Sequence, residues 1–138
     1  MTEDREIEEI RRQKIEQLRE ETGAEDTEQA SSSPDEPFAV DGQADLNAAV
    51  DDHDLVLTDF HADWCGPCQM LEPVVERIAA DTEAAVAKVD IDANQQLAAE
   101  YGVRGVPTLV LFADGSPVER LVGMQDEATL RNTVESYA

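Results

Sequence analysis

The sequence predicts an α/β fold, a central mixed sheet of about five strands flanked by four helices. Short runs of β-favouring residues alternate with segments in which apolar residues recur at helical spacing. The last two of these runs are joined by the dipeptide Asp114-Gly115, which is typical of an antiparallel hairpin. Alternating strands and helices that end in a hairpin indicate parallel and antiparallel strands in one sheet, with helices covering both of its faces.

The first half of this pattern contains two helices and one strand. A helix is predicted around residues 44–51, and residues 55–60 form a continuous β-favouring run that is typical of a central strand. A second helix is predicted over about 66–80, because its apolar residues recur at i, i+3, i+4 and i+7, and Pro73 should kink it. These apolar residues are Leu71, Val74, Val75 and Ile78.

The second half contains three strands and two helices. Strands are predicted over residues 86–90, 108–112 and 118–122, with a short helix over 94–101 between the first two. A closing helix follows the hairpin, and its apolar face is marked by Leu130, Val134 and Tyr137.

An acidic extension is expected to precede this domain. Residues 1–37 divide into a helix over about 3–21 and a linker over 22–37 whose composition is that of a flexible chain, so the domain is assigned to 38–138. The apolar face of the helix is narrow, and a marginal helix on a tether is the favoured interpretation. The alternatives that this helix docks on a partner, on the domain or on a second copy of the chain stay open. The face consists of Ile7, Ile10, Ile15 and Leu18.

The net charge of −22 limits the classes of partner. Binding to nucleic acid or to an anionic membrane needs clustered cations, so both are excluded here, and acidic partners are disfavoured. Lysine occurs only at Lys14 and Lys88, whereas aspartate is abundant. This composition resembles that of proteins from salt-loving archaea, in which concentrated salt shortens the Debye length to about 3 Å or less and screens self-repulsion. The alternative is an acidic protein from an ordinary cytoplasm.

The two cysteines are expected to be working thiols. Residues 1–21 contain no apolar run of the length that a secretory signal needs, and no stretch of the chain is apolar enough to span a bilayer. We therefore expect a cytoplasmic protein. Thiols in the cytosol are kept reduced, so a structural disulfide is disfavoured for Cys65 and Cys68.

These cysteines belong to the motif Trp-Cys-Gly-Pro-Cys at residues 64–68, between a predicted buried strand and a helix. A thiolate at a helix N-terminus faces unpaired backbone N–H groups and the positive end of the helix dipole, which lower its pKa. Pro67 suits the first helical turn, where its missing N–H has no cost. Cys65 and Cys68 stand at i and i+3, close enough for a disulfide that needs little backbone movement.

Four segments of the chain resemble the thioredoxin family in order and spacing. They are residues 59–68, 86–92, 101–108 and 122–123, and the resemblance covers about 38–138.

The resemblance implies a thioredoxin fold and a protein-disulfide reductase. Cys65 would be the more exposed nucleophile, which attacks a disulfide in a target protein, and Cys68 would resolve the mixed disulfide. A thioredoxin-reductase-type enzyme would then restore the dithiol. No bound cofactor or metal is expected, and the protein should be a monomer.

Asp59 is the next candidate, and its place in the chain supports it before the resemblance does. Leu55, Leu57 and Asp59 share one face of a buried strand, where burial should raise the pKa of the carboxyl group. Asp59 could then accept the proton of Cys68, directly or through a water. The alternative is an aspartate that reaches solvent near the strand end. The resemblance places Lys88 beside Asp59, in a tuning role or as an ordinary surface charge.

The resemblance also implies a docking surface for an extended target chain. Pro107 would follow a cis peptide bond, with the preceding backbone pairing with substrate beside the cysteines. Small residues let two backbones approach closely. Trp64 alone is equally compatible with a partly buried packing residue. The proposed surface consists of Trp64, Gly66, Pro67, Gly105, Val106, Pro107 and Gly123.

Two residues depart from the family pattern. His61 stands where a large aromatic residue is frequent, and Gln69 stands where a basic residue is frequent. Both put the thiol pKa and the reduction potential in question. A packed or solvated His61 is favoured over one that acts on the site.

The sequence disfavours three other functions. A zinc site needs four ligands, and His53 and His61 precede the Cys pair in positions that fit no zinc pattern. The intact Cys pair argues against a binding adaptor without redox activity. An oxidase or isomerase would use the same scaffold, but the Gly66-Pro67 dipeptide resembles that of the reducing members of the family.

Overall fold

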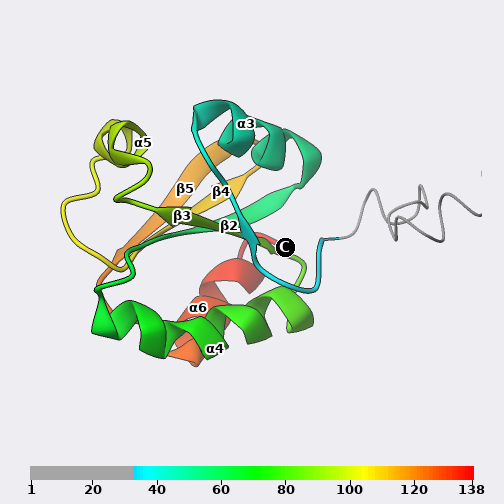
Figure 1. Ribbon diagram of the computed structural model, residues 1–138. Helices are drawn as coiled ribbons and strands as arrows, with labels where there is room; N and C mark the ends of the chain where they lie inside the picture. Colours follow the sequence, from blue (N-terminus) through cyan, green and yellow to red (C-terminus); the bar gives the residue numbers. More distant parts are fainter. Residues whose placement is uncertain (1–32) are drawn as a thin grey trace, which may run out of the picture. The chain divides into compact units, whose positions relative to one another are not determined.

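The computed structural model describes residues 33–138 (Figure 1). The helix predicted over 3–21 and most of the linker predicted over 22–37 lie outside these residues, and the domain boundary at 38 stays a prediction. The described elements, in chain order, are β1 (Phe38–Ala39), α3 (Gln43–Asp52), β2 (Leu55–His61), α4 (Gly66–Asp81), β3 (Ala85–Asp90), α5 (Gln95–Glu100), β4 (Thr108–Ala113), β5 (Ser116–Val122) and α6 (Glu127–Glu135).

The strands form one mixed sheet in the order β1-β3-β2-β4-β5. β3 pairs in parallel with both β1 and β2, whereas β4 pairs antiparallel with β2 and with β5. The predicted mixed sheet with four flanking helices is therefore confirmed. The pattern of β-favouring residues missed β1, because a strand of two residues is too short to show an alternation.

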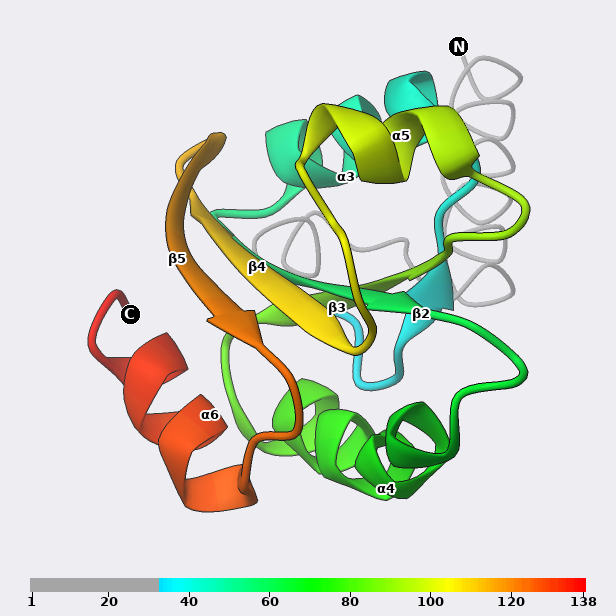
Figure 2. The ribbon, with the colours of Figure 1, turned by 90° about the vertical axis from the view of Figure 1, so that its left-hand side faces the viewer.

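Two pairs of helices cover the sheet (Figures 1 and 2). Helices α3 and α5 lie on one face, and α4 and α6 lie on the other. Each face has its own apolar core. The core under α4 and α6 includes Leu57, Leu71, Val75, Ile78, Leu109 and Leu130. The core under α3 and α5 includes Leu46, Val56, Phe60, Val89, Leu97 and Val110.

Strand β2 lies in the middle of the sheet, and its side chains alternate between these two cores. Leu55 and Leu57 point into the core under α4 and α6, whereas Val56 and Phe60 point into the other core. Period-two alternation therefore carries Asp59 to the face that α4 covers. The sequence prediction that these side chains share one face is confirmed.

The ends of the elements follow local chemistry. Asp114 and Gly115 have φ values of 52° and 84°, the left-handed conformation that a two-residue hairpin turn requires. Asp126 caps α6, since its Oδ1 accepts a hydrogen bond of 2.8 Å from the N–H of Thr129. Pro73 lies inside α4, which nonetheless continues to Asp81.

Candidate active site

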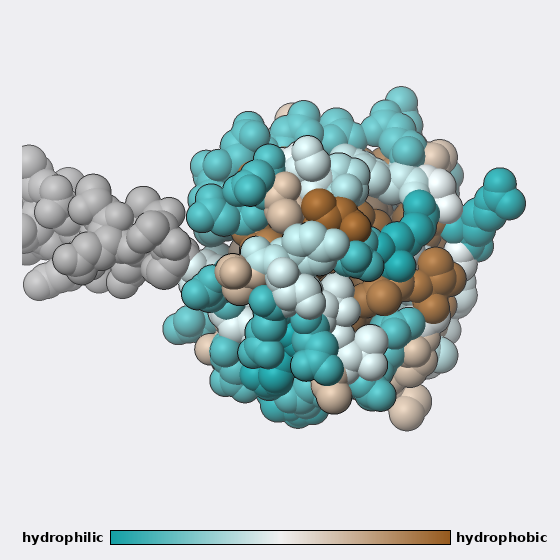
Figure 3. Space-filling model, turned by 180° about the vertical axis from the view of Figure 1, so that it is seen from behind, coloured by the Kyte–Doolittle hydropathy of each residue, from teal (hydrophilic) through white to brown (hydrophobic). Residues whose placement is uncertain are grey.

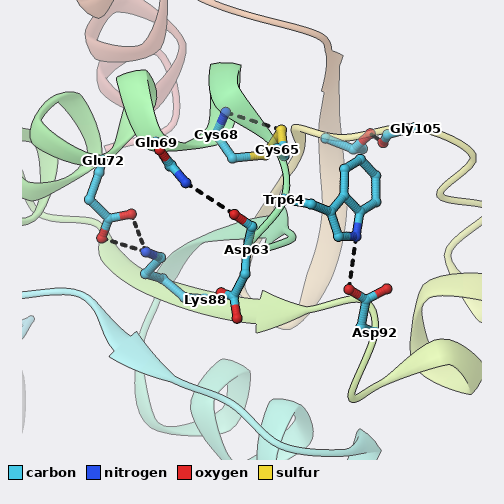
Figure 4. The surroundings of a disulfide bond; sticks show 10 residues. Asp63, Trp64, Cys65, Cys68, Gln69, Glu72, Lys88, Asp92 and Gly105 are labelled. Carbon is cyan, nitrogen blue, oxygen red and sulfur yellow. Dashed lines mark hydrogen bonds and ion pairs between the residues drawn. A yellow bond between two sulfur atoms is a disulfide. The ribbon is translucent and has the colours of Figure 1, made fainter.

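The candidate site lies where the chain passes from the end of β2 into α4. Cys65 is the N-cap residue of α4, and its Sγ accepts a hydrogen bond of 3.1 Å from the backbone N–H of Cys68 (Figure 4). The two residues form a disulfide, with Cα atoms 5.2 Å apart. The spacing in the sequence thus brings the two sulfur atoms together, from the N-cap of α4 and from its first turn.

This local geometry favours negative charge on Cys65. The N–H group that contacts its sulfur is one of the unpaired donors of the first helical turn. Pro67 occupies that turn without leaving a donor unpaired. A thiolate formed on Cys65 by reduction would meet a donor already in place, as well as the positive end of the dipole of a 16-residue helix.

The two cysteines do not differ in exposure. Each is 4% exposed, so the expectation of a more exposed Cys65 is not met in the oxidised state. Both belong to a small apolar cluster with Ala62, against which Ile91 and Val106 pack. These neighbours cover the disulfide. What distinguishes Cys65 is therefore its place ahead of the helix, rather than its accessible surface.

Asp59 is a buried carboxyl group without a full set of partners. It is 1% exposed, and its Oδ1 has no hydrogen-bond partner among the described residues. Burial raises its pKa from 3.8 to about 7, against the attraction of Lys88 and with a smaller contribution from repulsion by Glu72. The alternative in which this aspartate reaches solvent is excluded.

Lys88 lies beside Asp59 but pairs with another residue. Parallel pairing of β2 and β3 sets Lys88 next to Asp59 in register. Its ammonium group contacts both carboxylate oxygens of Glu72, from α4 (Figure 4). The Lys88 side chain is 18% exposed, so it is not an ordinary surface charge. Sequence reasoning missed Glu72, although its position four residues after Cys68 places it one turn along the same helix.

Trp64 is exposed and held by a hydrogen bond. Its side chain is 68% exposed, which excludes a packing role, and its Nε1–H donates to Oδ2 of Asp92 over 2.9 Å (Figure 4). Asp92 was not predicted as a site residue. A signal was present, because neighbouring parallel strands end at the same edge of a sheet and Asp92 follows β3 as Trp64 follows β2.

The two departures from the family pattern occupy different roles. Gln69 donates a hydrogen bond of 3.0 Å from its Nε2 to the carbonyl of Asp63 and so ties α4 to the loop before it. His61 is half-buried at the end of β2. Burial, and then repulsion by Lys88, lower its pKa below 6.5, so the imidazole is neutral near neutral pH.

The loop before β4 reaches the cysteines from the other side. The Val106–Pro107 peptide bond is cis, as the resemblance implied, and Val106 packs against the cysteine cluster. Gly123, at φ 88°, donates its backbone N–H to the carbonyl of Pro107 over 2.8 Å. A Cβ atom at Gly123 or at Gly66 would meet nothing within 4 Å, so the space beside both residues is open.

Several large apolar side chains are exposed at the surface. On the face shown in Figure 3, hydrophobic patches lie among hydrophilic residues. Besides Trp64, the most exposed are Met70 at 68%, Val122 at 66% and Met124 at 46%. Val122 and Met124 flank Gly123 in the chain, whereas Met70 lies in α4. Exposed apolar groups of this size often mark a surface that binds other proteins.

Residues 33–138 contain neither a candidate metal site nor a membrane-spanning helix. No group of three or more His, Cys, Asp or Glu side chains in this range is arranged to hold a metal ion. None of the helices described there has the length and apolar character needed to cross a membrane.

Comparison with known proteins gives consistent matches. Residues 38–136 match the family Thioredoxin. The thioredoxin of Chlamydia pneumoniae is 46% identical over 85 residues, which make up 61% of this chain and 83% of that protein. The thioredoxin of Staphylococcus aureus is 43% identical over 96 residues, or 68% of this chain and 91% of that protein. A solved mutant thioredoxin from Halobacterium salinarum is 64% identical, with a TM-score of 0.76, covering 78% of this chain and 95% of its own.

Proposed function

Because the chain belongs to the thioredoxin family, we propose that it reduces disulfides in other proteins with Cys65 as the attacking thiol, Cys68 as the resolving thiol and Asp59 as the proton acceptor. The chain is a protein-disulfide oxidoreductase that works by thiol–disulfide exchange at Cys65 and Cys68. The observation that carries the assignment of roles is the hydrogen bond from the N–H of Cys68 to Sγ of Cys65.

The proposed reaction has two steps. The Cys65 thiolate attacks one sulfur of the target disulfide, and the other target sulfur leaves as a thiolate that takes a proton from solvent. Cys68 then gives its proton to Asp59 and attacks the sulfur of Cys65. The bond between Cys65 and the target breaks, that target sulfur leaves as a thiolate that takes a proton from solvent, and the Cys65–Cys68 disulfide forms. Two electrons have passed from the protein dithiol to the target.

The position of Asp59 supports its part in the second step. Its strand face lies under α4, the helix that carries Cys68, and its Oδ1 has no partner among the described residues. With a pKa of about 7, Asp59 is ionised in part at neutral pH and is a far stronger base than an ordinary carboxylate. Such a pKa suits proton transfer at the pH of a cell.

Substitution of Asp59 by asparagine tests this role through the pH dependence of the rate. In single-turnover reduction of insulin by the reduced protein, we expect the wild-type rate to rise with pH through about 7, as Asp59 ionises. The D59N variant should lack this rise and be slower at pH 8 by roughly tenfold or more, because no base replaces the carboxylate. The exposed neighbour Asp63 gives the matched control, D63N. Identical profiles for D59N and the wild type would remove Asp59 from the mechanism.

We assign docking of the target to the predicted surface around the disulfide. Val106 packs on the cysteine cluster, and the open space at Gly66 and Gly123 leaves room for an approaching backbone. Trp64 is held with its ring exposed. Together with Pro67 and Pro107, these residues would contact an extended segment that carries the target disulfide.

Truncation of Trp64 tests the docking surface. We expect W64A to lower kcat/KM for insulin roughly tenfold, since an exposed aromatic anchor in a binding surface is typically worth more than 1 kcal/mol. Reaction with a small disulfide that does not need the surface should change little. Y137A is the control, because Tyr137 is an exposed aromatic residue near the end of α6. Equal losses for insulin and the small disulfide would contradict a docking role.

Direction and partners follow from the family. Membership implies interaction with disulfide-containing targets and with a thioredoxin reductase. We propose that the protein works as a reductant in the cytoplasm, as a monomer, without nucleic-acid or membrane partners. The charge of −22 and the similarity to the Halobacterium salinarum protein support work in concentrated salt. Measurement of the reduction potential of the Cys65–Cys68 couple would show in which direction electrons flow between this couple and a target disulfide.

A further inference from the structure

Lys88 lies between two carboxylates and pairs with only one of them. Asp59 is its neighbour in register on β2, and Glu72 faces it from α4. Adjacent strands are about 4.8 Å apart, so a lysine side chain at this register could reach either carboxyl group. The ammonium group contacts both oxygens of Glu72 (Figure 4). Oδ1 of Asp59 has no hydrogen-bond partner within residues 33–138.

The pairing directs Lys88 toward the outside of the domain. Lys88 and Glu72 both line an open cleft of about 450 Å³, whereas Asp59 does not. The Glu72 side chain is 40% exposed, against 1% exposure for Asp59. The ammonium group is therefore held beside the open cleft by a carboxylate that is itself partly exposed. The other lining residues are Asp35, Glu36, Pro37 and Glu76.

We propose that Glu72 is a positioning residue that keeps the ammonium group of Lys88 from pairing with Asp59, and so leaves Asp59 free to accept the proton of Cys68. The inference rests on the proposed function of Asp59. Glu72 itself touches neither the cysteines nor the target in this scheme. It acts mainly through Lys88, and its own repulsion of Asp59 is a smaller, direct contribution.

The chemistry of the alternative pairing shows why this matters. A direct Lys88–Asp59 contact would stabilise the ionised carboxylate and make it a weaker base. Lys88 lowers the pKa of Asp59 and Glu72 raises it, so removal of Glu72 should lower this pKa in two ways. The repulsion from Glu72 is lost, and Lys88 is released toward Asp59. Both changes favour the ionised form.

Other charged groups surround the three residues. His61 on β2 is neutral near pH 7, because its pKa is lowered. The remaining groups are acids. Those that line the cleft attract the ammonium group of Lys88, whereas Asp63 and Asp90 act on His61. These acids are Asp35 and Glu36 ahead of β1, Asp63 after β2, Asp90 at the end of β3 and Glu76 on α4.

Among these acids, Glu76 is the matched control for Glu72. It follows Glu72 by one helical turn, lines the same cleft and carries the same charge, but it is not in a salt bridge with Lys88. A general change in local charge would therefore affect both variants, E72Q and E76Q, to a similar degree. An effect through Lys88 would appear in E72Q alone.

The test follows the carboxyl carbon of Asp59 by NMR in the full-length oxidised protein as pH is varied. We expect E72Q to lower the titration midpoint of Asp59 by about one pH unit and E76Q to leave it nearly unchanged. K88Q should raise the midpoint. In the K88Q background, adding E72Q should produce a much smaller shift than it does alone, because the lysine is gone and only the direct repulsion by Glu72 is lost.

The outcomes separate this inference from the proposed function. An unchanged or raised midpoint in E72Q, an equal shift in E76Q, or a full shift in the K88Q background would each overturn the positioning role of Glu72. The proposed function of Asp59 fails instead on the rate profile of D59N, which does not involve Glu72. If Glu72 acts as proposed, the inflection of the rate profile should move to lower pH together with the Asp59 midpoint.

Discussion

Substitution of Cys65 by serine is expected to abolish disulfide reduction, whereas substitution of Cys68 is expected to stop the reaction halfway. A serine hydroxyl at position 65 is too weak a nucleophile to attack the target, although it can still cap α4. In C68S the Cys65 thiolate is intact and forms a mixed disulfide with the target. Nothing then resolves it, so a covalent complex accumulates.

Turnover of insulin and mass spectrometry of the unreduced mixture distinguish the two variants. We expect no detectable turnover for either, an adduct for C68S and none for C65S. The double variant C65S/C68S is the control for adducts that form at other residues. Full activity of C65S would end the proposed mechanism, and an adduct that forms on C65S through Cys68 would reverse the two roles.

Asp59 is expected to make the stability of the protein fall as the pH rises. The pKa of its carboxyl group is near 3.8 when the chain is unfolded and about 7 when it is folded. Between these values the folded protein binds more protons than the unfolded chain, so the free energy of unfolding decreases with increasing pH. A difference of about three pKa units corresponds to roughly 4 kcal/mol in the free energy of unfolding. This contribution is present in full below about pH 4 and is lost above about pH 7.

Denaturant unfolding of the oxidised protein at several pH values measures this effect. The surface carries many other carboxylates, so the useful quantity is the difference between D59N and the wild type at each pH. We expect D59N to gain stability relative to the wild type as pH rises from about 4 to about 7, and to be the more stable protein at pH 8. Parallel stability curves would show that Asp59 ionises as readily in the folded protein as in the unfolded chain.

The stability that is lost when Asp59 ionises explains why a buried carboxyl group at this position indicates a function. An apolar residue in the row of Leu55 and Leu57 would pack against α4 without a desolvation penalty. A group that destabilises the fold at the working pH is typical of a site where chemistry is favoured over stability.

Much of the fold could be predicted, because its signals are local. The buried strand is indicated by the run 55–60 alone, and the buried face of the helix is indicated by the apolar spacing within 66–80 alone. Neither pattern depends on the rest of the chain. The Asp114-Gly115 turn fixes a hairpin by the same kind of local rule. Strand β1 could not be found in this way, since Phe38 and Ala39 become a strand only by pairing with β3.

In the candidate site too, the features that local patterns determine could be predicted, and those that depend on packing could not. The Cys65–Cys68 pair follows from spacing along one helix, and the burial of Asp59 follows from alternation along one strand. The contacts of Glu72 with Lys88 and of Asp92 with Trp64 join residues 16 and 28 positions apart. They depend on how α4 packs on the sheet and on how β3 pairs with β2. The equal burial of the two cysteines has the same origin, because Ile91 and Val106 reach them from distant segments.

The two outer strands of the sheet bear on how the protein meets unfolded chains. β1 is two residues long. β5 carries Pro117, the two charged residues Glu119 and Arg120, and an irregularity in its pairing opposite Leu111 and Phe112. Short, charged or bulged edges offer a poor template for adding a further strand. If the protein binds extended segments of its targets as proposed, its sheet edges would not pair with them. Backbone pairing would then be expected only at the loop beside the disulfide.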